Sequence, residues 1–247
     1  MSLERWRGKV ALVTGASSGI GRAIAERLAA GGLKVAALAR RAERLDELCA
    51  GEGEWLALPC DLRDEASLLD AFARVRAEWG GVDVLVNNAG LGHKAPLTSG
   101  ATEHWREMLE VNVLALCVAT REAVADMQRR GGTGHVIHVS SMSAHRVPGG
   151  SGVYSATKYA VRSLTEGLRL ELREQGSPIR VSAVSPGFVE TEFAAHYHRD
   201  PAAAAETYSR YKVLDSEDVA EAVAYLLGAP DHVQVHDLLM RPTEQPS

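Results

Sequence analysis

A tyrosine and a lysine four residues apart, Tyr154 and Lys158, form the pair in this sequence that is best suited to moving a proton. In a helix, residues at i and i+4 lie on one face, with Cβ atoms roughly 5–6 Å apart. A lysine ammonium beside the phenol would favour the phenolate and lower the pKa of Tyr154 from its usual value of about 10. The pair predicts proton transfer near neutral pH, although the same spacing is common on ordinary amphipathic helices.

A glycine-rich turn near the start of the chain is the second segment with chemical meaning. The apolar run at residues 9–14 predicts a buried parallel strand, and a helical pattern begins at Arg22. Gly15, Gly19 and Gly21 lie between them, in a spacing that differs from the general fingerprint Gly-x-Gly-x-x-Gly. Glycines let the backbone approach a pyrophosphate, and the following helix directs its unpaired N–H groups toward the phosphates. We therefore expect a dinucleotide at this turn.

The rest of the chain alternates between apolar runs and segments with helical periodicity. This alternation implies right-handed crossovers and a parallel sheet that is covered on both faces. We expect a Rossmann-type doubly wound sandwich, a parallel seven-stranded sheet flanked by helices, with residues 1–247 as a single dinucleotide-binding catalytic domain. Strands are predicted at 9–14, 34–39, 54–60, 82–86, 134–140, 179–185 and 233–239, and helices near 20–31, 42–50, 64–79, 102–130, 153–175 and 216–228.

Glycine, proline or polar residues directly follow six of the predicted strands. In sheets of this class, ligands bind outside the carboxyl ends of the strands. These residues should therefore meet at one edge of the sheet, and they are Gly15, Arg40, Asp61, Asn88, Ser141 and Pro186.

Several short motifs occur in an order and at separations that are typical of one family. They are Thr14-Gly-Ala-Ser-Ser-Gly-Ile-Gly21, Asp61, Asn87-Asn-Ala-Gly90, Asn112, Ser141, Tyr154 with Lys158, and Pro186-Gly-Phe-Val-Glu-Thr191. On these motifs the chain resembles the short-chain dehydrogenase/reductase superfamily, in its single-domain branch, over essentially its whole length. The tail at 232–245 is similar to that of the animal dehydrogenase/reductase members numbered eleven and of their bacterial relatives.

The resemblance implies an oxidoreductase in which Tyr154 exchanges a proton with the substrate oxygen. It also implies that Lys158 lowers the pKa of the phenol and bonds the nicotinamide ribose, with Asn112 holding a water behind it. Ser141 would donate a hydrogen bond to the substrate carbonyl, and one such donor contributes about 2.7–4 kcal/mol. The interval of thirteen residues before Tyr154 favours Ser141 over its neighbours.

Several of these residues also have a simpler explanation. Asp61 could cap the helix that follows it. The asparagine pair at 87–88 could bond the local backbone in a turn. Asn112 could bend its own helix by bonding the backbone, and such a distortion would expose a carbonyl to the water. Ser140 and Ser143 remain rivals of Ser141.

The end of the second predicted strand indicates which nicotinamide cofactor binds. An NAD-binding unit normally carries a carboxylate there, about 20 residues beyond the glycines. This chain has Arg40 and Arg41 instead, which can pair with a 2′-phosphate or can simply be solvated charges at a helix start. We expect NADP(H), with Ser17 as a further donor. The expected cofactor-binding residues are Gly15, Ser17, Ser18, Gly19, Ile20, Gly21, Arg40, Arg41, Asp61, Leu62, Asn88, Gly90, Tyr154, Lys158, Pro186, Val189 and Thr191.

The segment near 190–212 carries aromatic side chains between two better-defined elements, and we expect it to be a substrate lid. Its aromatic residues favour an apolar ligand, whereas Lys94 and Arg146 could bind the carboxylate of a hydroxy acid. The substrate residues expected are Ser141, Tyr154, Ser143, His145 and Phe193.

Composition excludes other classes of function. The net charge of −5 and the absence of a basic run argue against a nucleic-acid partner. The charged start and the lack of a long apolar run predict neither a signal peptide nor a membrane span, and hence a cytoplasmic protein. None of the nine histidines has zinc-site spacing, so no metal is expected. Relatives of this length usually assemble, which implies a homotetramer or homodimer.

We therefore expect an NADPH-dependent carbonyl reductase or alcohol dehydrogenase that transfers a hydride between NADP(H) and a ketone, aldehyde or secondary alcohol, with Tyr154 as general acid/base. One alternative is an NADP-dependent dehydrogenase of small 3-hydroxy acids. Another is a non-catalytic NADPH-binding sensor. The complete set of Asn112, Ser141, Tyr154 and Lys158 argues against the sensor, because a sensor needs only the glycine loop.

Overall fold

The computed structural model describes residues 2–198, 202 and 208–246 and contains one parallel sheet of seven strands. The strand order is β3-β2-β1-β4-β5-β6-β7, and every neighbouring pair is parallel. The predicted doubly wound α/β fold is thereby confirmed. The strands are β1 (Val10–Thr14), β2 (Lys34–Ala39), β3 (Glu54–Pro59), β4 (Val84–Asn87), β5 (His135–Val139), β6 (Arg180–Pro186) and β7 (Asp237–Met240).

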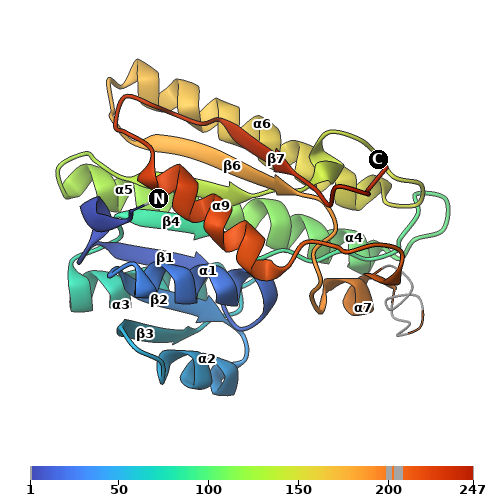
Figure 1. Cartoon of the computed structure of the whole chain (residues 1–247), viewed down its shortest axis with the longest axis horizontal. Coiled ribbons are helices and arrows are strands. Elements are labelled where there is room, and N and C mark those ends of the chain that lie inside the picture. The colour runs from blue at the N-terminus through green and yellow to red at the C-terminus, as the bar shows by residue number, and fades with distance from the viewer. Residues whose placement is uncertain (1, 199–201, 203–207, 247) are drawn as a thin grey trace.

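Helices cover both faces of the sheet, and Figure 1 shows α1 and α9 in front of the strands. The helices described are α1 (Gly19–Ala30), α2 (Ala42–Cys49), α3 (Glu65–Trp79), α4 (Thr102–Leu109), α5 (Ala115–Arg129), α6 (Gly152–Glu174), α7 (Phe193–His198) and α9 (Ser216–Gly228), with short turns η1 (Glu4–Trp6), η2 (Glu110–Leu114) and η3 (Met142–Ala144). No helix in the described part of the chain combines the length and apolarity needed to cross a bilayer.

The central strands are apolar throughout because each of their faces belongs to a different core. In β1, Ala11 and Val13 pack with α1 and α9, whereas Val10 and Leu12 pack with α3 and α5. Alternate residues of a strand point to opposite faces, so a strand buried on both sides must be a continuous apolar run. This is why the run at 9–14 identified its strand correctly.

Two elements differ from the sequence expectation. The predicted helix over 102–130 is interrupted by η2, a π-helical turn over Glu110–Leu114 that contains the buried Asn112. The last strand was predicted at 233–239 but pairs only from Asp237, opposite Ala183. Residues before it form a turn in which the Val233 N–H donates to the Pro230 carbonyl, so their apolar side chains do not mark a strand.

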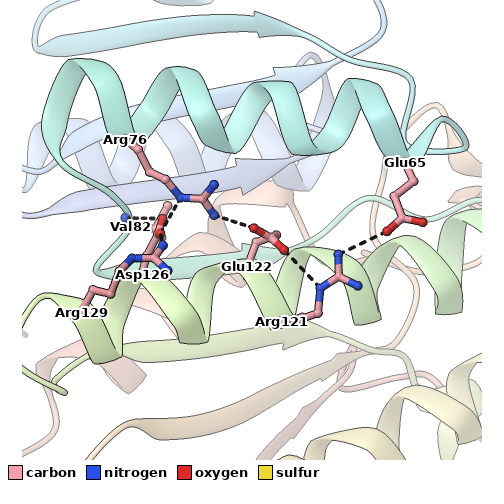
Figure 2. A network of polar contacts seen from close by, with 7 residues as sticks. All are labelled: Glu65, Arg76, Val82, Arg121, Glu122, Asp126 and Arg129. Carbon is pink, nitrogen blue, oxygen red and sulfur yellow. Dashed lines mark hydrogen bonds and ion pairs between the residues drawn. The ribbon is translucent and has the colours of Figure 1, made fainter.

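A network of charged side chains joins α3 to α5 beside the sheet (Figure 2). Asp126 is 1% exposed and accepts hydrogen bonds from Arg76 Nε at 2.7 Å and from the Val82 N–H at 3.2 Å. Arg129 also contacts this carboxylate, and Arg76 reaches Glu122 at 2.6 Å. A buried carboxylate is tolerated only when it is paired in this way.

Replacing Asp126 by alanine is expected to lower the free energy of unfolding by about 2–3 kcal/mol, because the Val82 N–H and the Arg76 guanidinium lose their buried acceptor. Urea unfolding followed by circular dichroism measures the change. Glu65→Ala is the matched control, since Glu65 and Arg121 are 56% and 59% exposed and an exposed pair contributes about 0–1 kcal/mol. Equal effects of the two substitutions would show that burial of Asp126 is not what makes the network stabilising.

Candidate active site

The turn between β1 and α1 leaves the first N–H groups of the helix without a side-chain cap. Ser18 occupies the N-cap position but makes no side-chain cap hydrogen bond, and the first turn of α1 has no acidic residue. Gly19 has a φ of +53°, and a Cβ there would lie 3.0 Å from Thr191 Cγ2. Glycine thus allows the turn to lie against the loop after β6. The uncapped donors and the dipole of a 12-residue helix suit a phosphate.

Asn88 joins the end of β4 to this turn by hydrogen bonds. Its side-chain amide donates to the Thr14 carbonyl at 2.9 Å, and its backbone N–H donates to Thr14 Oγ1 at 3.1 Å. Asn87 is buried, and its amide donates to Thr120 Oγ1 at 3.0 Å. Gly21 also belongs to this packing, because a Cβ there would lie 2.3 Å from the Gly15 carbonyl oxygen. The asparagines therefore join neighbouring elements rather than closing a local turn.

The two arginines after β2 have different surroundings. Arg41 donates to Ser17 Oγ at 3.1 Å and Ser18 Oγ at 2.9 Å, so a guanidinium and two hydroxyls meet beside the glycine turn. Arg40 is exposed. Glu192, from the segment that precedes α7, binds Arg41 at 3.1 Å and Arg44 at 2.7 Å. The cluster can hold an anion, and it already pairs with one carboxylate of the protein.

Asp61 follows β3 at the same edge of the sheet. A fork of hydrogen bonds from Arg63, the shortest at 2.7 Å, lowers the pKa of Asp61 to about 2. Its side chain remains 38% exposed and can accept a further hydrogen bond. The helix cap is Asp64 instead, whose carboxylate accepts from the Ala66 N–H at 3.0 Å. Asp61 is therefore not the cap of α3. Leu62 follows it, half-buried.

Tyr154 and Lys158 lie on one face of α6, with the Lys158 ammonium 5.9 Å from the centroid of the tyrosine ring. Lys158 Nζ donates to the Val139 carbonyl at 3.0 Å, and burial lowers the pKa of the lysine to about 8. A Cβ on Gly90 would lie 3.4 Å from this nitrogen. Because Gly90 has no side chain, space remains beside the ammonium in the loop that follows β4.

The pKa of Tyr154 does not follow the expectation of a phenol acidified by its lysine. Burial raises it to about 12, a hydrogen bond with Ser141 acts in the opposite direction, and Tyr197 raises it further. The Lys158 ammonium lies over the tyrosine ring and donates its hydrogen bond to the Val139 carbonyl, so it does not lower the pKa of the phenol as expected. At neutral pH the phenol of Tyr154 is therefore protonated and has a proton to donate.

Asn112 holds the loop after β4 in place. Its side chain accepts from the Leu91 N–H at 2.9 Å and donates to the Leu91 carbonyl at 2.8 Å and to Thr157 Oγ1 at 3.0 Å. Both amide hydrogens therefore have protein partners, and the amide oxygen retains one lone pair. Asn112 lies in the π-helical turn, where backbone carbonyls depart from the regular helical pattern.

Among the three serines after β5, Ser141 is the one whose hydroxyl acts on the Tyr154 phenol, where it lowers the pKa. Its hydroxyl also accepts the Ser143 N–H at 3.1 Å, which places Ser143 beside it. Ser140 is 4% exposed, and its hydroxyl has no partner among the described residues. This effect on the pKa of the phenol favours Ser141 over Ser140 and Ser143.

Aromatic rings cover the phenol. The ring centroid of Tyr154 lies 5.4 Å from that of Phe193 and 6.3 Å from that of Tyr197, both on α7. A Cβ on Gly92 would lie 2.8–3.1 Å from all three rings. Glycine at this position allows the rings to pack together, and they form an apolar wall beside Tyr154 and Lys158.

Not every expected substrate residue reaches this wall. His145 Nε2 lies 3.0 Å from Asp237 Oδ2 at the start of β7, so its ring is engaged there. Arg146 is half-buried, and its Nε is buried without a partner among the described residues. Of the expected lid at 190–212, residues 199–201 and 203–207, including Pro201, lie outside the described residues.

The loop after β6 completes the site, and Figure 1 shows α7 and the C-terminus at the end of the molecule toward which the strands run. Pro186 ends β6, and Val189 is 8% exposed and forms a β-bridge with Leu214. Ile20 is half-buried in the first turn of α1. Sequence patterns did not identify Glu192, which follows this loop and binds Arg41, or Gln245, which accepts the Phe188 N–H of the loop.

Within the described part of the chain, no group of three or more histidine, cysteine, aspartate or glutamate side chains is arranged to hold a metal ion. His93, for example, contacts other side chains of the protein. Its ring lies 2.7 Å from Glu107 and stacks on His104, with centroids 4.3 Å apart.

Comparison with known proteins agrees with this geometry. The sequence profile of the short chain dehydrogenase family matches residues 9–202. Dehydrogenase/reductase SDR family member 11 of Bos taurus is 51% identical over 253 residues, which cover 98% of this chain and 99% of the relative. Farnesol dehydrogenase of Aedes aegypti is 42% identical over 249 residues, 97% and 98% of the two chains. The closed form of a serine dehydrogenase complexed with NADP+ superimposes with a TM-score of 0.91 at 37% identity, over 96% of each chain.

Proposed function

This chain belongs to the short-chain dehydrogenase family, and from that premise we propose that it is an NADPH-dependent carbonyl reductase. It would transfer a hydride between NADP(H) and a ketone, aldehyde or secondary alcohol. The observation that carries the proposal is the partly buried phenol of Tyr154, which lies with Lys158 on one face of α6, is covered by the rings of α7, and is acted on by the hydroxyl of Ser141. A protonated donor beside a hydroxyl is what the oxygen of a carbonyl undergoing reduction requires.

The residues around the glycine turn fit NADP(H). The uncapped start of α1 suits the pyrophosphate, and Arg41 with Ser17 and Ser18 suits the extra phosphate of the adenosine ribose. Asp61 would accept the adenine amino group, with Leu62, Gly90 and Pro186 along the path. Val189 and Thr191 would meet the nicotinamide end. A structure similar to this chain over 96% of its length is complexed with NADP+.

When bound, the cofactor supplies or accepts the hydride. Ser141 would orient the substrate oxygen and stabilise the charge that develops on it. Tyr154 would donate the proton to that oxygen in reduction and remove it in oxidation. Lys158 would bond the nicotinamide ribose and return a proton to the phenol, and the backbone of the π-helical turn around Asn112 would hold the water behind it.

The wall of Phe193, Tyr197 and Tyr154 favours an apolar carbonyl substrate over a small charged one. Farnesol dehydrogenase of Aedes aegypti, at 42% identity, is a relative whose name indicates an apolar alcohol. A dehydrogenase of small 3-hydroxy acids is the second candidate. It is favoured by the fold's similarity to a serine dehydrogenase and by the buried Nε of Arg146, which has no partner in the described part of the chain. Arg146→Ala would lower turnover of carboxylate substrates but not of neutral ketones if this candidate is right.

NADPH oxidation measured with diacetyl, isatin, aromatic aldehydes, a 17-keto-steroid and small oxo acids tests the proposal, with NADH in parallel. Turnover of neutral carbonyls is the expected result, and turnover of oxo acids alone would favour the second candidate. Tight NADPH binding with no turnover in any class would favour the sensor.

Replacing Arg41 by alanine is expected to weaken NADPH binding by about 10–100-fold and to leave NADH binding nearly unchanged, because a charge-assisted bond to a phosphate contributes about 1.5–3 kcal/mol. Quenching of intrinsic fluorescence gives both dissociation constants. Arg40→Ala is the matched control, since Arg40 is exposed and only Arg41 contacts the serine hydroxyls. An equal loss in the control, or an equal loss for both cofactors, would contradict the assignment of the 2′-phosphate to Arg41.

Glu192 is expected to compete with that phosphate for Arg41 and Arg44. The two ion pairs lower the pKa of the Glu192 carboxyl, so it is charged at neutral pH and would repel a phosphate. Glu192→Gln should therefore tighten NADPH binding by roughly two- to fivefold, the range of an exposed ion pair, with no change for NADH. Glu190→Gln, two residues earlier, serves as the control in the same titration. Weaker binding of NADPH by Glu192→Gln would show instead that the carboxylate orients the arginines.

We further propose that the chain is cytoplasmic, that it forms a homotetramer or homodimer, and that residues 190–212 act as its substrate lid. Assembly through the helices of 102–130 and 153–175 would cover exposed leucines on α4, η2 and α6. They are Leu109, Leu114 and Leu170, which are 50%, 59% and 48% exposed. Sedimentation velocity measures the assembly directly.

A further inference from the structure

The C-terminal tail lies beside the loop that follows β6. Pairing between β6 and β7 ends at Pro186 opposite Met240, and the Gly187 N–H donates to the Met240 carbonyl at 2.8 Å. Among the described residues, the strand pairing of β6 with β7 does not continue beyond this point. A turn over the next residues, in which the Gln245 N–H donates to the Pro242 carbonyl at 3.1 Å, brings the tail back to it.

Gln245 is the residue of the tail that contacts the loop. Its side-chain Oε1 accepts the Phe188 N–H at 3.0 Å, and the residue is only 5% exposed although it is third from the end of the chain. A Cβ on Gly187 would lie 2.3 Å from the same oxygen, so the glycine leaves the space that Gln245 fills. A buried polar side chain with a specific hydrogen-bond donor is a fixed part of the structure.

The other side of the loop is bound by Leu214, which follows the expected lid at 190–212. The Leu214 N–H donates to the Phe188 carbonyl at 3.0 Å, and the Glu190 N–H donates to the Leu214 carbonyl at 2.9 Å. Val189 lies between these bonds, and Thr191 follows. The two residues proposed to meet the nicotinamide are therefore held by Gln245 from one side and Leu214 from the other.

We propose that Gln245 is a positioning residue that holds the loop at 186–191 in its cofactor-binding conformation, so that the C-terminal tail determines how tightly the nicotinamide half of the cofactor is bound. This inference rests on the proposed NADP(H) function. Gln245 acts through the backbone of Phe188 and has no role at the adenosine end, where the binding groups are Arg41 and the serine hydroxyls.

The test compares two ligands on the full chain. Isothermal titration with NADP+ reports both halves of the site, and titration with adenosine 2′,5′-bisphosphate reports the adenosine half alone. Gln245→Met has a similar size but no acceptor, and we expect it to weaken NADP+ binding by about 3–10-fold, the equivalent of one hydrogen bond, and to leave the bisphosphate unchanged. Gln245→Glu keeps an acceptor oxygen and should recover most of the loss.

Glu244→Met, an exposed neighbour in the same turn, is the matched control and should bind both ligands like the wild type. Unchanged NADP+ binding by Gln245→Met would overturn the inference and leave the proposed function standing. An equal loss for both ligands would also overturn it, because a general structural effect does not distinguish the two halves. Failure of the wild-type protein to bind NADP+ would overturn the proposed function and this inference with it.

Discussion

Tyr154→Phe is expected to lower kcat/KM for carbonyl reduction by about 10³-fold or more, while NADPH binding changes by less than about threefold. The substitution removes only the phenolic hydroxyl, and general acid catalysis contributes about 10²–10⁴-fold. The ring stays, so its contacts with Phe193 and Tyr197 remain. Steady-state kinetics with the best carbonyl of the panel, together with NADPH titration, measure both quantities.

Tyr197→Phe is the matched control for that experiment, because it removes a phenolic hydroxyl from the same aromatic wall without touching the proton donor. We expect its kcat/KM to stay within about fivefold of the wild type. A Tyr154→Phe enzyme that keeps more than a tenth of the activity would show that another group, or solvent, protonates the product.

Lys158→Met is expected to lower kcat/KM by about 10²–10³-fold and to change the pH profile of reduction. Burial lowers the pKa of Lys158 to about 8, whereas that of Tyr154 is raised to about 12. As the pH rises through about 8, the lysine loses its proton and its charge while the phenol stays protonated. Wild-type reduction should therefore be level below pH of about 8 and fall above it, and the variant should lack this limb.

Rates from pH 6 to 10, roughly two units on either side of that pKa, measure the profile. Met takes the place of the aliphatic part of the buried Lys158 side chain. Far-ultraviolet circular dichroism of both proteins serves as the check on folding. The same limb near pH 8 in the variant would assign the titration to another group and contradict the role of Lys158.

The fold was predictable because its signals are local. The strand at 9–14 is apolar on both faces, and the left-handed Gly19 together with the following helix marks the turn at which a dinucleotide is expected. The π-helical turn at Glu110–Leu114 was not predicted as an element, because Asn112 leaves the helical pattern to bond Leu91 and Thr157, which are distant in sequence.

The parts of the site that could not be predicted depend on contacts between distant segments. Spacing placed Tyr154 and Lys158 on one face of a helix correctly, but the pKa of the phenol depends on burial under α7 and on where the ammonium donates its hydrogen bond. Glu192 reaches Arg41 across 151 positions, and Gln245 reaches Phe188 across 57. Neither Glu192 nor Gln245 belongs to a recognisable sequence motif, and only the fold brings the two residues to the site.

Transfer of deuterium from the cofactor to the product is the measurement that tests the proposed reaction most directly. NADPH labelled with deuterium at C4, prepared with the label on either face, is incubated with the enzyme and a neutral ketone, and the alcohol is analysed by mass spectrometry. One of the two labelled cofactors should give an alcohol with a single deuterium on the former carbonyl carbon, and Tyr154→Phe should form almost none. Unlabelled alcohol from both cofactors, or no alcohol from any carbonyl of the panel while NADPH binds tightly, would contradict hydride transfer by this protein.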